Sequence, residues 1–373
     1  MRTFFLKTMK KKIALVGCTG NIGKQTVRIV RENPERFSFS ALLSGSDEEG
    51  MNALKREFSP RFSHCAARGE LSDPELDALF SDCDVALIAA GGFAGLRYTL
   101  SAIRAGKTVA LANKESLVCG GEIVTDLAKQ NGVEIVPVDS EHSALFQALS
   151  FRRDTPFERL VLTASGGPFF KLSQTELKKV TAKDALAHPT WNMGKKITID
   201  SATLLNKGYE VIEAKWLYNA DFKQIEAIVH PESIVHSIVR FQDGASIAQL
   251  AYPDMRLPIQ LALTYPERLP CLDQIDFAKL GELHFYPFPQ EKFPCFSLAL
   301  EAGKAGGIAP AVLNGAGETA VAAFLGGRIG FMQIAETIQG VLDKIPNRKA
   351  DCFETLKEAD FKAKEIAKNL IYG

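Results

Sequence analysis

Apolar residues in the first third of the chain gather in short runs, separated by stretches with helical spacing. The earliest run, Lys12–Gly17 (KIALVG), is almost wholly apolar, which is typical of a strand covered on both faces. Asn21–Glu32 then carries apolar residues at helical spacing. Four later runs predict further strands, at Phe37–Ser44, Asp84–Gly92, Thr108–Asn113 and Val133–Asp139. This alternation predicts an α/β domain with a parallel, doubly wound sheet over residues 10–139.

The pattern changes after Asp139. Thr155–Gly167 and Lys195–Ser201 predict strands, with a mixed, loop-rich segment between them. Glu226–Tyr252 is rich in β-branched residues and contains a turn signal at Asp243–Gly244. These features predict an α+β domain over residues 140–264, expected to be catalytic. Prolines mark a linker over residues 265–295, and the helical pattern of residues 296–373 predicts a C-terminal helical bundle.

Length and charge narrow the classes of protein to consider. A chain of 373 residues is longer than one hydrophobic core usually supports, which agrees with several domains. Its 44 lysines and arginines balance 44 acidic residues. Bulk charge therefore gives no reason to expect binding to nucleic acid or to an anionic membrane surface.

Targeting signals and cysteines favour a cytoplasmic protein. No apolar run approaches the roughly 18 residues of a membrane span. Met1–Thr8 has too few apolar residues for a secretory signal, and we expect a disordered extension there, before a start at Met9. The seven cysteines are scattered without a CxxC pair, so neither a zinc knuckle nor a disulfide framework is indicated. Reduced thiols in the cytoplasm are the plain interpretation.

A glycine-rich loop joins the first predicted strand to the first predicted helix. Gly17, Gly20 and Gly23 are spaced as GxxGxxG, and the missing side chains permit close approach of a pyrophosphate to the helix N-terminus. This predicts a Rossmann-like dinucleotide site, although the same glycines could serve a tight turn without a ligand. Asp47 follows the second strand and favours NAD, because a carboxylate can accept a hydrogen bond from the free 2′-hydroxyl of the NAD ribose. The alternative is a solvated turn residue.

Two carboxylates follow the last predicted strand of the first domain. Asp139 and Glu141 lie two residues apart, so their side chains would point the same way in an extended segment. Carboxylate oxygens in that arrangement suit Mg²⁺ or Mn²⁺. The alternative is an acidic turn in which Asp139 caps a helix.

A second stretch, from His188 to Glu210, is dense in hydrogen-bond donors. Ser201, Asn206 and Lys207 could converge on a phosphate through hydroxyl, amide and ammonium groups. If a helix starts near Ala202, Asn206 and Glu210 lie one turn apart, with Glu213 three residues further on. Glu210 would then be a third metal ligand beside Asp139 and Glu141.

Several other polar residues carry weaker signals. Lys114, after the fourth strand, could balance charge at the metal or polarise a carbonyl group. The turn at Ser165 could bind phosphate, or it could be a turn without a ligand. His188, near Trp191, is a better functional candidate than the histidines expected to be structural, which are His142, His230 and His236. A lid over a substrate would also need large apolar residues to exclude water.

Seven segments, in this order, closely resemble the 1-deoxy-D-xylulose 5-phosphate reductoisomerase family of the methylerythritol phosphate route to isoprenoids. They are GCTGNIG, LANKESLV, PVDSEHSALFQ, TASGGPF, HPTWNMGKKITIDSATLLNKGYEVIEA, VHPESIVHSIVRFQDG and PDMRLPI. The most specific strings are DSEHSA and KKITIDSATLLNKG. The resemblance implies a metal-dependent rearrangement of 1-deoxy-D-xylulose 5-phosphate, followed by reduction with NADPH to 2-C-methyl-D-erythritol 4-phosphate.

The resemblance also implies roles for individual residues and a homodimer. The implied ligands of Mg²⁺ or Mn²⁺ are Asp139, Glu141 and Glu210. The implied catalytic residues are Lys114, Glu141 and His188. Substrate contacts are implied for Lys114, Ser140, Glu141, Ser165, His188, Trp191, Ser201, Asn206, Lys207 and Glu210. Cofactor contacts are implied for Thr19, Gly20, Asn21, Ile22, Gly45, Asn113, Glu115, Gly194 and Met255.

The chain departs from the family pattern at two places. Members commonly carry a basic or amide pair just after Gly45, where this chain has Ser46 and Asp47, which leaves strict preference for NADPH over NADH open. The usual NAAN-E string is NGAGE here, over Asn314–Glu318, and we expect its helix to persist. Two alternatives stay open: a plain NAD(P)-dependent dehydrogenase of a phosphorylated substrate, and a nucleotide-sensing protein without enzymatic activity.

Overall fold

The computed structural model describes residues 10–150, 154–187, 190–191 and 193–373, so the predicted extension Met1–Thr8 lies outside the described residues. The chain forms two compact units. Unit 1 comprises the chain up to Asn113, Leu127–Val138 and Met255–Cys271. Unit 2 comprises Lys114–Asp126, Asp139–Asp254 and Leu272–Gly373. The domain limits predicted from the sequence stay predictions.

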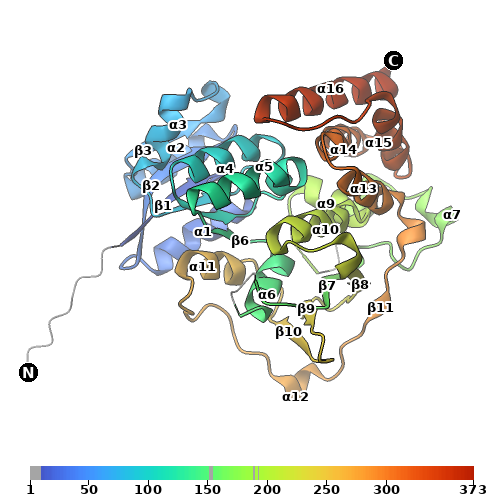
Figure 1. Cartoon of the computed structure of the whole chain (residues 1–373), viewed down its shortest axis with the longest axis horizontal. Helices are drawn as coiled ribbons and strands as arrows, with labels where there is room; N and C mark the ends of the chain where they lie inside the picture. Colours follow the sequence, from blue (N-terminus) through green and yellow to red (C-terminus); the bar gives the residue numbers. More distant parts are fainter. Residues whose placement is uncertain (1–9, 151–153, 188–189, 192) are drawn as a thin grey trace, which may run out of the picture. The chain divides into compact units, whose positions relative to one another are not determined.

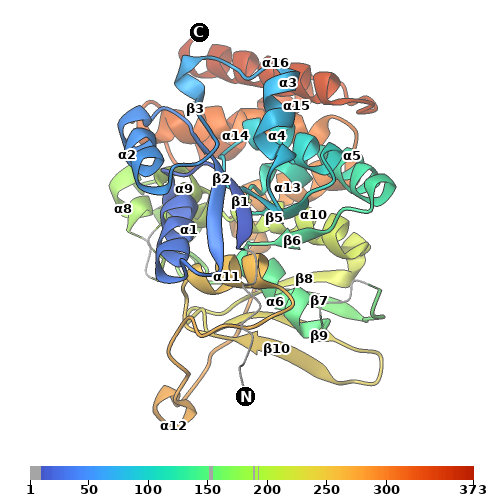
Figure 2. The same cartoon turned by 90° about the vertical axis from the view of Figure 1, so that its left-hand side faces the viewer.

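Unit 1 is built on a parallel sheet (Figures 1 and 2). Its strands are β1 (Lys11–Val16), β2 (Phe37–Ser44), β3 (Phe62–Cys65), β4 (Val85–Ile88), β5 (Thr108–Leu111) and β6 (Ile135–Pro137). Their order, β3-β2-β1-β4-β5-β6, is that of doubly wound dinucleotide-binding folds and confirms the predicted sheet. Sequence reasoning missed β3, because this edge strand has only four residues and most of them are half-exposed.

Helices connect these strands in the expected alternation. They are α1 (Asn21–Glu32), α2 (Glu48–Phe58), the 3₁₀ helix η1 (Ala66–Arg68), α3 (Asp73–Ser81), α4 (Ala94–Arg104), α5 (Glu115–Asn131) and α11 (Arg256–Thr264). The last of these packs against α1, although it follows much later in the sequence. Helix α5 has a non-helical residue at Gly120, and its first part belongs to unit 2.

The turn between β1 and α1 requires glycine at its first position. Gly17 has a φ of +92°, and a Cβ atom there would lie 2.5 Å from the carbonyl oxygen of Ala89. The chain therefore passes directly over the end of β4 before entering α1. Gly20 precedes α1 and provides no side-chain cap, so the backbone N–H groups of the first turn face a position where an anion can bind.

Unit 2 contains a mixed sheet of order β10-β9-β7-β8-β11. Its strands are β7 (Arg159–Ala164), β8 (Ile225–Val229), β9 (Val235–Arg240), β10 (Ser246–Leu250) and β11 (Tyr286–Pro287). β7 and β8 run parallel, and the other neighbours run antiparallel. Helix α6 (Ser140–Ala148) packs against β9 and β10. This arrangement confirms the predicted α+β character, with a strand shorter than the predicted Thr155–Gly167.

The strand predicted over Lys195–Ser201 is wrong, because this segment is helix α9 (Lys195–Ala202). β-branched residues suggested a strand, but that preference is weak, and contacts one helical turn apart together with burial override it. Thr198 Oγ1 donates to the carbonyl oxygen of Gly194, and Lys196 Nζ lies 2.7 Å from Asp200 Oδ2, one helical turn away. Ile199 and Asp200 are both buried, which a half-exposed strand would not achieve.

Helices make up the rest of unit 2. The shorter ones are α7 (Gln174–Leu177), α8 (Ala182–Leu186), η2 (Phe222–Gln224), α12 (Phe277–Leu280) and η3 (Gln290–Lys292). The longer ones are α10 (Leu205–Tyr218), α13 (Pro294–Ala305), α14 (Ala309–Leu325), α15 (Gln333–Lys344) and α16 (Phe353–Tyr372). The last four pack on one another in the orange to red part of Figure 1, which confirms the predicted C-terminal bundle.

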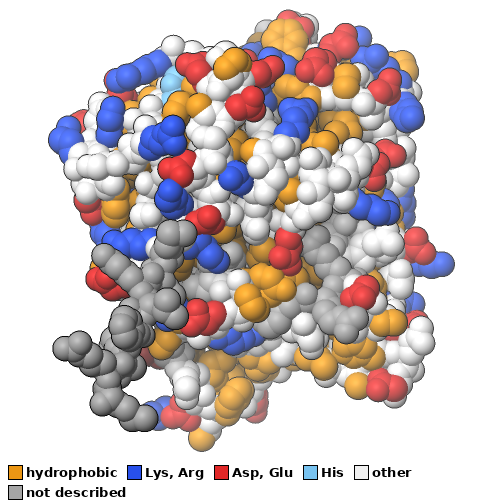
Figure 3. All heavy atoms as spheres, turned by 60° about the vertical axis from the view of Figure 1, so that its left-hand side comes forward, with side chains coloured by type: hydrophobic (Ala, Val, Ile, Leu, Met, Phe, Trp, Pro, Cys, Tyr) orange, Lys and Arg blue, Asp and Glu red, His pale blue; other side chains and the backbone are white. Residues whose placement is uncertain are grey.

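The surface and the cysteines agree with the composition. On the face drawn in Figure 3, basic and acidic side chains lie among one another rather than gathering in a patch of one sign. No helix in the described ranges is long and apolar enough to cross a membrane. All seven cysteines are free thiols; five are buried and Cys352 is exposed.

The NGAGE string lies inside α14, so the expectation that its helix persists is confirmed. A Cβ atom on Gly315 would lie 2.6 Å from the backbone oxygen of Asp360, in α16. Near this contact, Asn314 Nδ2 donates to Asp360 Oδ1 and to Glu318 Oε1, both at 3.1 Å. Glycine therefore allows close contact between α14 and α16.

We expect Gly315→Ala to destabilise the fold by about 1–2 kcal/mol, because overpacking against a rigid backbone oxygen outweighs the helix propensity that alanine adds. Gly340→Ala, in α15, is the control, since its methyl group would meet only the flexible Leu370 side chain, at 3.2 Å. Urea unfolding followed by circular dichroism measures both. A Gly315→Ala protein at least as stable as the wild type would contradict this packing argument.

Candidate functional site

Three acidic side chains of unit 2 converge where α6 begins. Asp139 directly precedes α6, Glu141 lies in its first turn and Glu210 comes from α10. One carboxylate oxygen from each lies within 4.8 Å of the others, so the three could hold one metal ion. The predicted convergence is present, but the extended geometry used to predict it is wrong. The helix begins at Ser140, and the turn into that helix brings Asp139 and Glu141 together.

Asp139 occupies the N-cap position of α6 without capping it. Its side chain makes no capping hydrogen bond. Instead, Lys114 Nζ donates to Asp139 Oδ2 at 2.8 Å. The alternative of a plain capped acidic turn therefore does not describe this carboxylate.

Lys207 joins the other two carboxylates. Its Nζ donates to Glu141 Oε1 at 2.8 Å, to the Thr163 carbonyl oxygen at 2.6 Å and also to Glu210 Oε2. Asn206 Nδ2 donates to Glu210 Oε1 at 2.5 Å, which confirms that these two residues lie one helical turn apart. Lys207 and Glu210 are both almost fully buried. A buried ammonium group thus sits directly among the predicted ligands.

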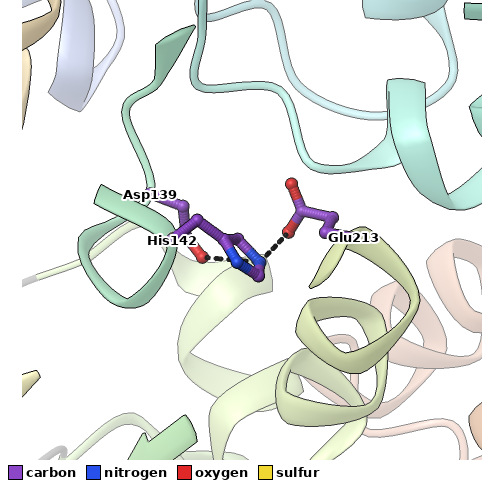
Figure 4. A group of neighbouring side chains, drawn as sticks. All are labelled: Asp139, His142 and Glu213. Carbon is purple, nitrogen blue, oxygen red and sulfur yellow. Dashed lines mark ion pairs between the residues drawn. The ribbon is translucent and has the colours of Figure 1, made fainter. Parts of the chain in front are cut away.

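A second group of side chains shares Asp139 (Figure 4). Oxygen or nitrogen atoms of Asp139, His142 and Glu213 also lie within 4.8 Å of one another. His142 Nε2 is 3.3 Å from Glu213 Oε2 and 3.9 Å from Asp139 Oδ2. Lys114 Nζ lies 3.3 Å from the same Glu213 oxygen and 3.7 Å from Glu210 Oε1. We call Asp139, Glu141, Glu210 and Glu213 the carboxylate cluster.

The charges of the cluster shift the titration of its members. Burial raises the pKa of Glu141, but the neighbouring Lys207 outweighs burial and lowers this pKa to about 2. Burial and the nearby Glu141 raise the pKa of Glu210 to about 7. Burial lowers the pKa of Lys114 and Lys207, but the carboxylates around them raise it above its ordinary value. Both lysines therefore stay charged at neutral pH.

The predicted phosphate donors lie around the end of β7. Ser165 follows this strand, and its Oγ accepts a hydrogen bond from Gly167 N at 3.2 Å. A Cβ atom on Gly167 would lie 3.2 Å from the backbone oxygen of Ser201, so this loop touches the end of α9. Lys207 reaches the carbonyl oxygen of Thr163 in the same strand. The loop after Ser165 thus adjoins α9, and Lys207 reaches β7, whereas the amide of Asn206 donates to Glu210.

For the other predicted substrate residues, the structure gives one contact each or none. Ser140 Oγ donates to Glu141 Oε2 at 2.5 Å. The Trp191 ring lies 6.3 Å from the ring of His236. His188 lies outside the described residues. His230 is structural, as expected, because its Nε2 accepts from the backbone N–H groups of Ile234 and Val235.

Most predicted cofactor residues belong to unit 1. Thr19, Gly20, Asn21 and Ile22 form the turn into α1, Gly45 follows β2, and Met255 directly precedes α11. Asn113 follows β5, and its Nδ2 donates to the carbonyl oxygens of Ala90 and Gly92. Glu115 and Gly194 belong to unit 2, in which Glu115 Oε1 lies 3.4 Å from Lys196 Nζ.

Asp47 caps a helix. It precedes α2, and its Oδ1 accepts from Gly50 N at 2.8 Å. This geometry favours the interpretation as a turn residue over that of a ribose ligand.

Sequence reasoning missed Arg68. This exposed residue ends η1, where Ala67 N donates to the carbonyl oxygen of Gly45. The Arg68 guanidinium pairs with Glu48, one residue after Asp47. A positive charge therefore lies beside the turn that follows β2, where dinucleotide-binding folds select between a 2′-hydroxyl and a 2′-phosphate. The only signal in the sequence was a lone arginine after an unrecognised strand.

Family models match most of the chain. The model described as 1-deoxy-D-xylulose 5-phosphate reductoisomerase matches residues 13–78 and 75–121. The model of the 1-deoxy-D-xylulose 5-phosphate reductoisomerase C-terminal domain matches residues 135–218. The model of the DXP reductoisomerase C-terminal domain matches residues 250–366.

Curated relatives and solved structures carry the same name. The 1-deoxy-D-xylulose 5-phosphate reductoisomerases of Geobacillus sp. (strain WCH70) and Pelotomaculum thermopropionicum are 45% and 46% identical, over 97% of this chain and 100% and 98% of theirs. The Zymomonas mobilis enzyme in complex with NADPH has a TM-score of 0.86 at 37% identity, covering 98% of this chain and 100% of its own. A DOX-P reductoisomerase in complex with NADPH, fosmidomycin and magnesium has a TM-score of 0.89 at 36% identity, covering 97% and 98%.

Crowding of carboxylates around Glu210 has a measurable effect on stability. Its pKa of about 7 in the folded chain exceeds the roughly 4.3 of an unfolded glutamate. The folded state therefore binds the extra proton between these values, and stability falls as pH rises from about 4.3 through 7. Glu210→Gln removes this loss while Lys207 keeps Glu141 and the Thr163 carbonyl oxygen as partners.

We expect Glu210→Gln to raise the free energy of unfolding at pH 8 by roughly 3–4 kcal/mol in the presence of a chelator, and by much less at pH 5. Urea unfolding at both pH values measures this difference. The surface variant Glu122→Gln, in α5, is the control and should show no such dependence. A gain for Glu210→Gln that is equal at both pH values would contradict the assigned repulsion.

Proposed function

The chain belongs to the 1-deoxy-D-xylulose 5-phosphate reductoisomerase family, and we propose that it converts 1-deoxy-D-xylulose 5-phosphate to 2-C-methyl-D-erythritol 4-phosphate with NADPH and a divalent metal ion. The observation that carries this proposal is the convergence of Asp139, Glu141 and Glu210 beside Lys207 in a relative of enzymes crystallised with NADPH and magnesium. A plain dehydrogenase or a nucleotide sensor would leave these three acids without a role.

The ligand set fits a hard divalent cation. The three side chains offer carboxylate oxygens and no thiol, which is the donor set that Mg²⁺ and Mn²⁺ prefer. Four carboxylates of the cluster face two lysine ammonium groups, so acidic groups outnumber basic ones around the proposed ligands. A divalent ion would add positive charge where the acids are in excess. When bound, it supplies a Lewis acid that polarises substrate oxygens and holds them in one geometry.

We assign the substrate's two ends to different side chains of unit 2. Lys114 and Ser140 contact the reacting end, since both adjoin the ligand set. Ser165, Ser201, Asn206 and Lys207 hold the phosphate, which supplies binding energy remote from the reacting bonds. The resemblance adds His188 as a third catalytic residue beside Lys114 and Glu141, and Trp191 as a further substrate contact.

NADPH is held mainly by unit 1 in this proposal. Its pyrophosphate binds at the N-terminus of α1, where Thr19 to Ile22 present backbone N–H groups. We also assign cofactor contacts to Gly45, Asn113, Glu115, Gly194 and Met255. We further propose that Arg68 binds the 2′-phosphate, because Ser46 and Asp47 supply no positive charge after β2.

A homodimer in the cytoplasm completes the proposal. The free thiols agree with a reducing compartment. β10 is an edge strand of its sheet, and its residue Ile247 is 47% exposed. An apolar, unpaired strand edge is a surface that commonly pairs with another chain.

Removal of the metal or of a ligand should abolish turnover. We expect NADPH oxidation with 1-deoxy-D-xylulose 5-phosphate to require Mg²⁺ or Mn²⁺, and Asp139→Asn to lower kcat/KM by about a thousandfold, because both remove the Lewis acid. Absorbance at the NADPH band measures the rate. The surface variant Asp126→Asn, in α5, is the control. Oxidation that continues in excess chelator would refute the metal assignment.

The role of Arg68 predicts a change in cofactor preference. Arg68→Ala should weaken NADPH binding about tenfold and leave NADH binding unchanged, since only NADPH carries the 2′-phosphate. Nicotinamide fluorescence titrations measure both dissociation constants. Arg61→Ala, which removes another exposed arginine of unit 1, should change neither constant. An equal loss for both nucleotides would show that Arg68 acts on the fold rather than on the phosphate.

A further inference from the structure

Glu213 is a buried acid to which the proposed reaction gives no task. It lies three residues after Glu210 in α10, and its exposed fraction is 3%. A buried carboxylate without a partner would be strongly destabilising, so its contacts should explain its presence. Figure 4 shows its side chain beside His142, with Asp139 on the other side of the imidazole ring.

One oxygen of Glu213 is shared by two nitrogen groups. Oε2 lies 3.3 Å from Lys114 Nζ and 3.3 Å from His142 Nε2. Neither ring nitrogen of His142 meets hydrogen-bond geometry with another described residue, and neither does Glu213 Oε2, so both contacts of this oxygen are ion-pair distances. Glu213 is thus the carboxylate nearest to His142 in the described part of the chain, and it is one of three around Lys114.

Lys114 and a bound cation would compete for the carboxylate of Asp139, and Glu213 can relieve this competition. Its Nζ donates to Asp139 Oδ2, which is also an oxygen of the proposed ligand set. A cation that binds Asp139 must share this carboxylate with the ammonium group, and the two positive charges repel each other. Glu213 lies outside the proposed ligand set and offers Lys114 a second anion at 3.3 Å.

Glu213 could instead be a metal ligand itself, because Asp139, His142 and Glu213 also lie close enough to bind an ion. The charges argue against this. Lys114 Nζ lies 3.3 Å from the same Glu213 oxygen that a metal would use, and it also pairs with Asp139 and Glu210. A divalent ion there would meet a fixed positive charge at contact distance.

We propose that Glu213 is a positioning residue, which holds the Lys114 ammonium group and so leaves Asp139 available to the divalent cation. This inference rests on the proposed function, since it takes Asp139 as a metal ligand. Glu213 acts through Lys114 and touches neither the metal nor the substrate. His142 Nε2 lies 3.3 Å from the same Glu213 oxygen.

The test is a double-mutant cycle read out by metal affinity. Isothermal titration with Mg²⁺ or Mn²⁺ alone, without substrate or nucleotide, gives the dissociation constants of the wild type, Glu213→Gln, Lys114→Met and the double variant. We expect Glu213→Gln to weaken binding about tenfold in the wild-type background and to have little effect once Lys114 is absent. Glu122→Gln serves again as the control for the loss of one surface charge.

Each other outcome overturns a distinct claim. Equal weakening by Glu213→Gln in both backgrounds would show that Glu213 acts on the metal directly, and no weakening in either would remove its role. Failure of the wild type to bind metal, or unchanged binding in Asp139→Asn, would instead overturn the proposed function.

If circular dichroism shows that Lys114→Met does not fold, the metal affinity of the conservative variant Glu213→Asp tests the positioning role instead. Glu213→Asp keeps the charge and should recover most of the metal affinity that Glu213→Gln loses. An equal loss in both variants would overturn the positioning role.

Discussion

Buried like charges are the constraint on which unit 2 depends. The carboxylate cluster brings four acids together, of which Glu210 and Glu213 are buried and the other two are half-buried, and such groups repel one another strongly. Lys114 and Lys207 make this arrangement possible by pairing with all of its members. Breaking a buried pair typically destabilises a protein by about 3–5 kcal/mol, so these lysines support the fold as well as the chemistry.

Helix α10 concentrates this constraint in one element. Lys207, Glu210 and Glu213 recur at intervals of three residues, so they share one face of the helix. The same face would serve a solvated helix poorly, because it gathers acids that repel one another. In the proposed function, a cation bound between this face and α6 would relieve the repulsion. Stability is thereby exchanged for affinity, as is common at functional sites.

Elements that depend on neighbouring residues in the sequence were predictable, whereas elements decided by contacts in the folded chain were not. The glycine loop between β1 and α1 was recognisable because an apolar run, a tight turn and a helix stand next to one another in the sequence. The segment Lys195–Ala202 was not, since its β-branched residues favour a strand and only contacts within the folded unit decide otherwise. Asp139 and Glu210 were paired correctly for a partly wrong reason, because the start of α6 could not be read from the sequence.

Two roles depended on pairings that no periodicity encodes. Glu213 was noticed as a neighbour of Glu210, yet its task follows from Lys114, which lies 99 positions earlier in the chain. Arg68 meets Glu48 only because the short strand β3 joins the edge of the sheet. Contacts between distant positions need the fold before they can be recognised.

The placement of the thiols bears on how this protein withstands oxidants and electrophiles. A thiolate is the reactive form of cysteine, and burial raises the pKa of Cys18 to about 12 and that of Cys295 also to about 12. Both sulfur atoms are therefore protonated and shielded. Cys352 is exposed just before α16, so peroxide or an alkylating agent meets this sulfur first. Chemical damage then falls on the surface, away from the glycine loop that carries Cys18.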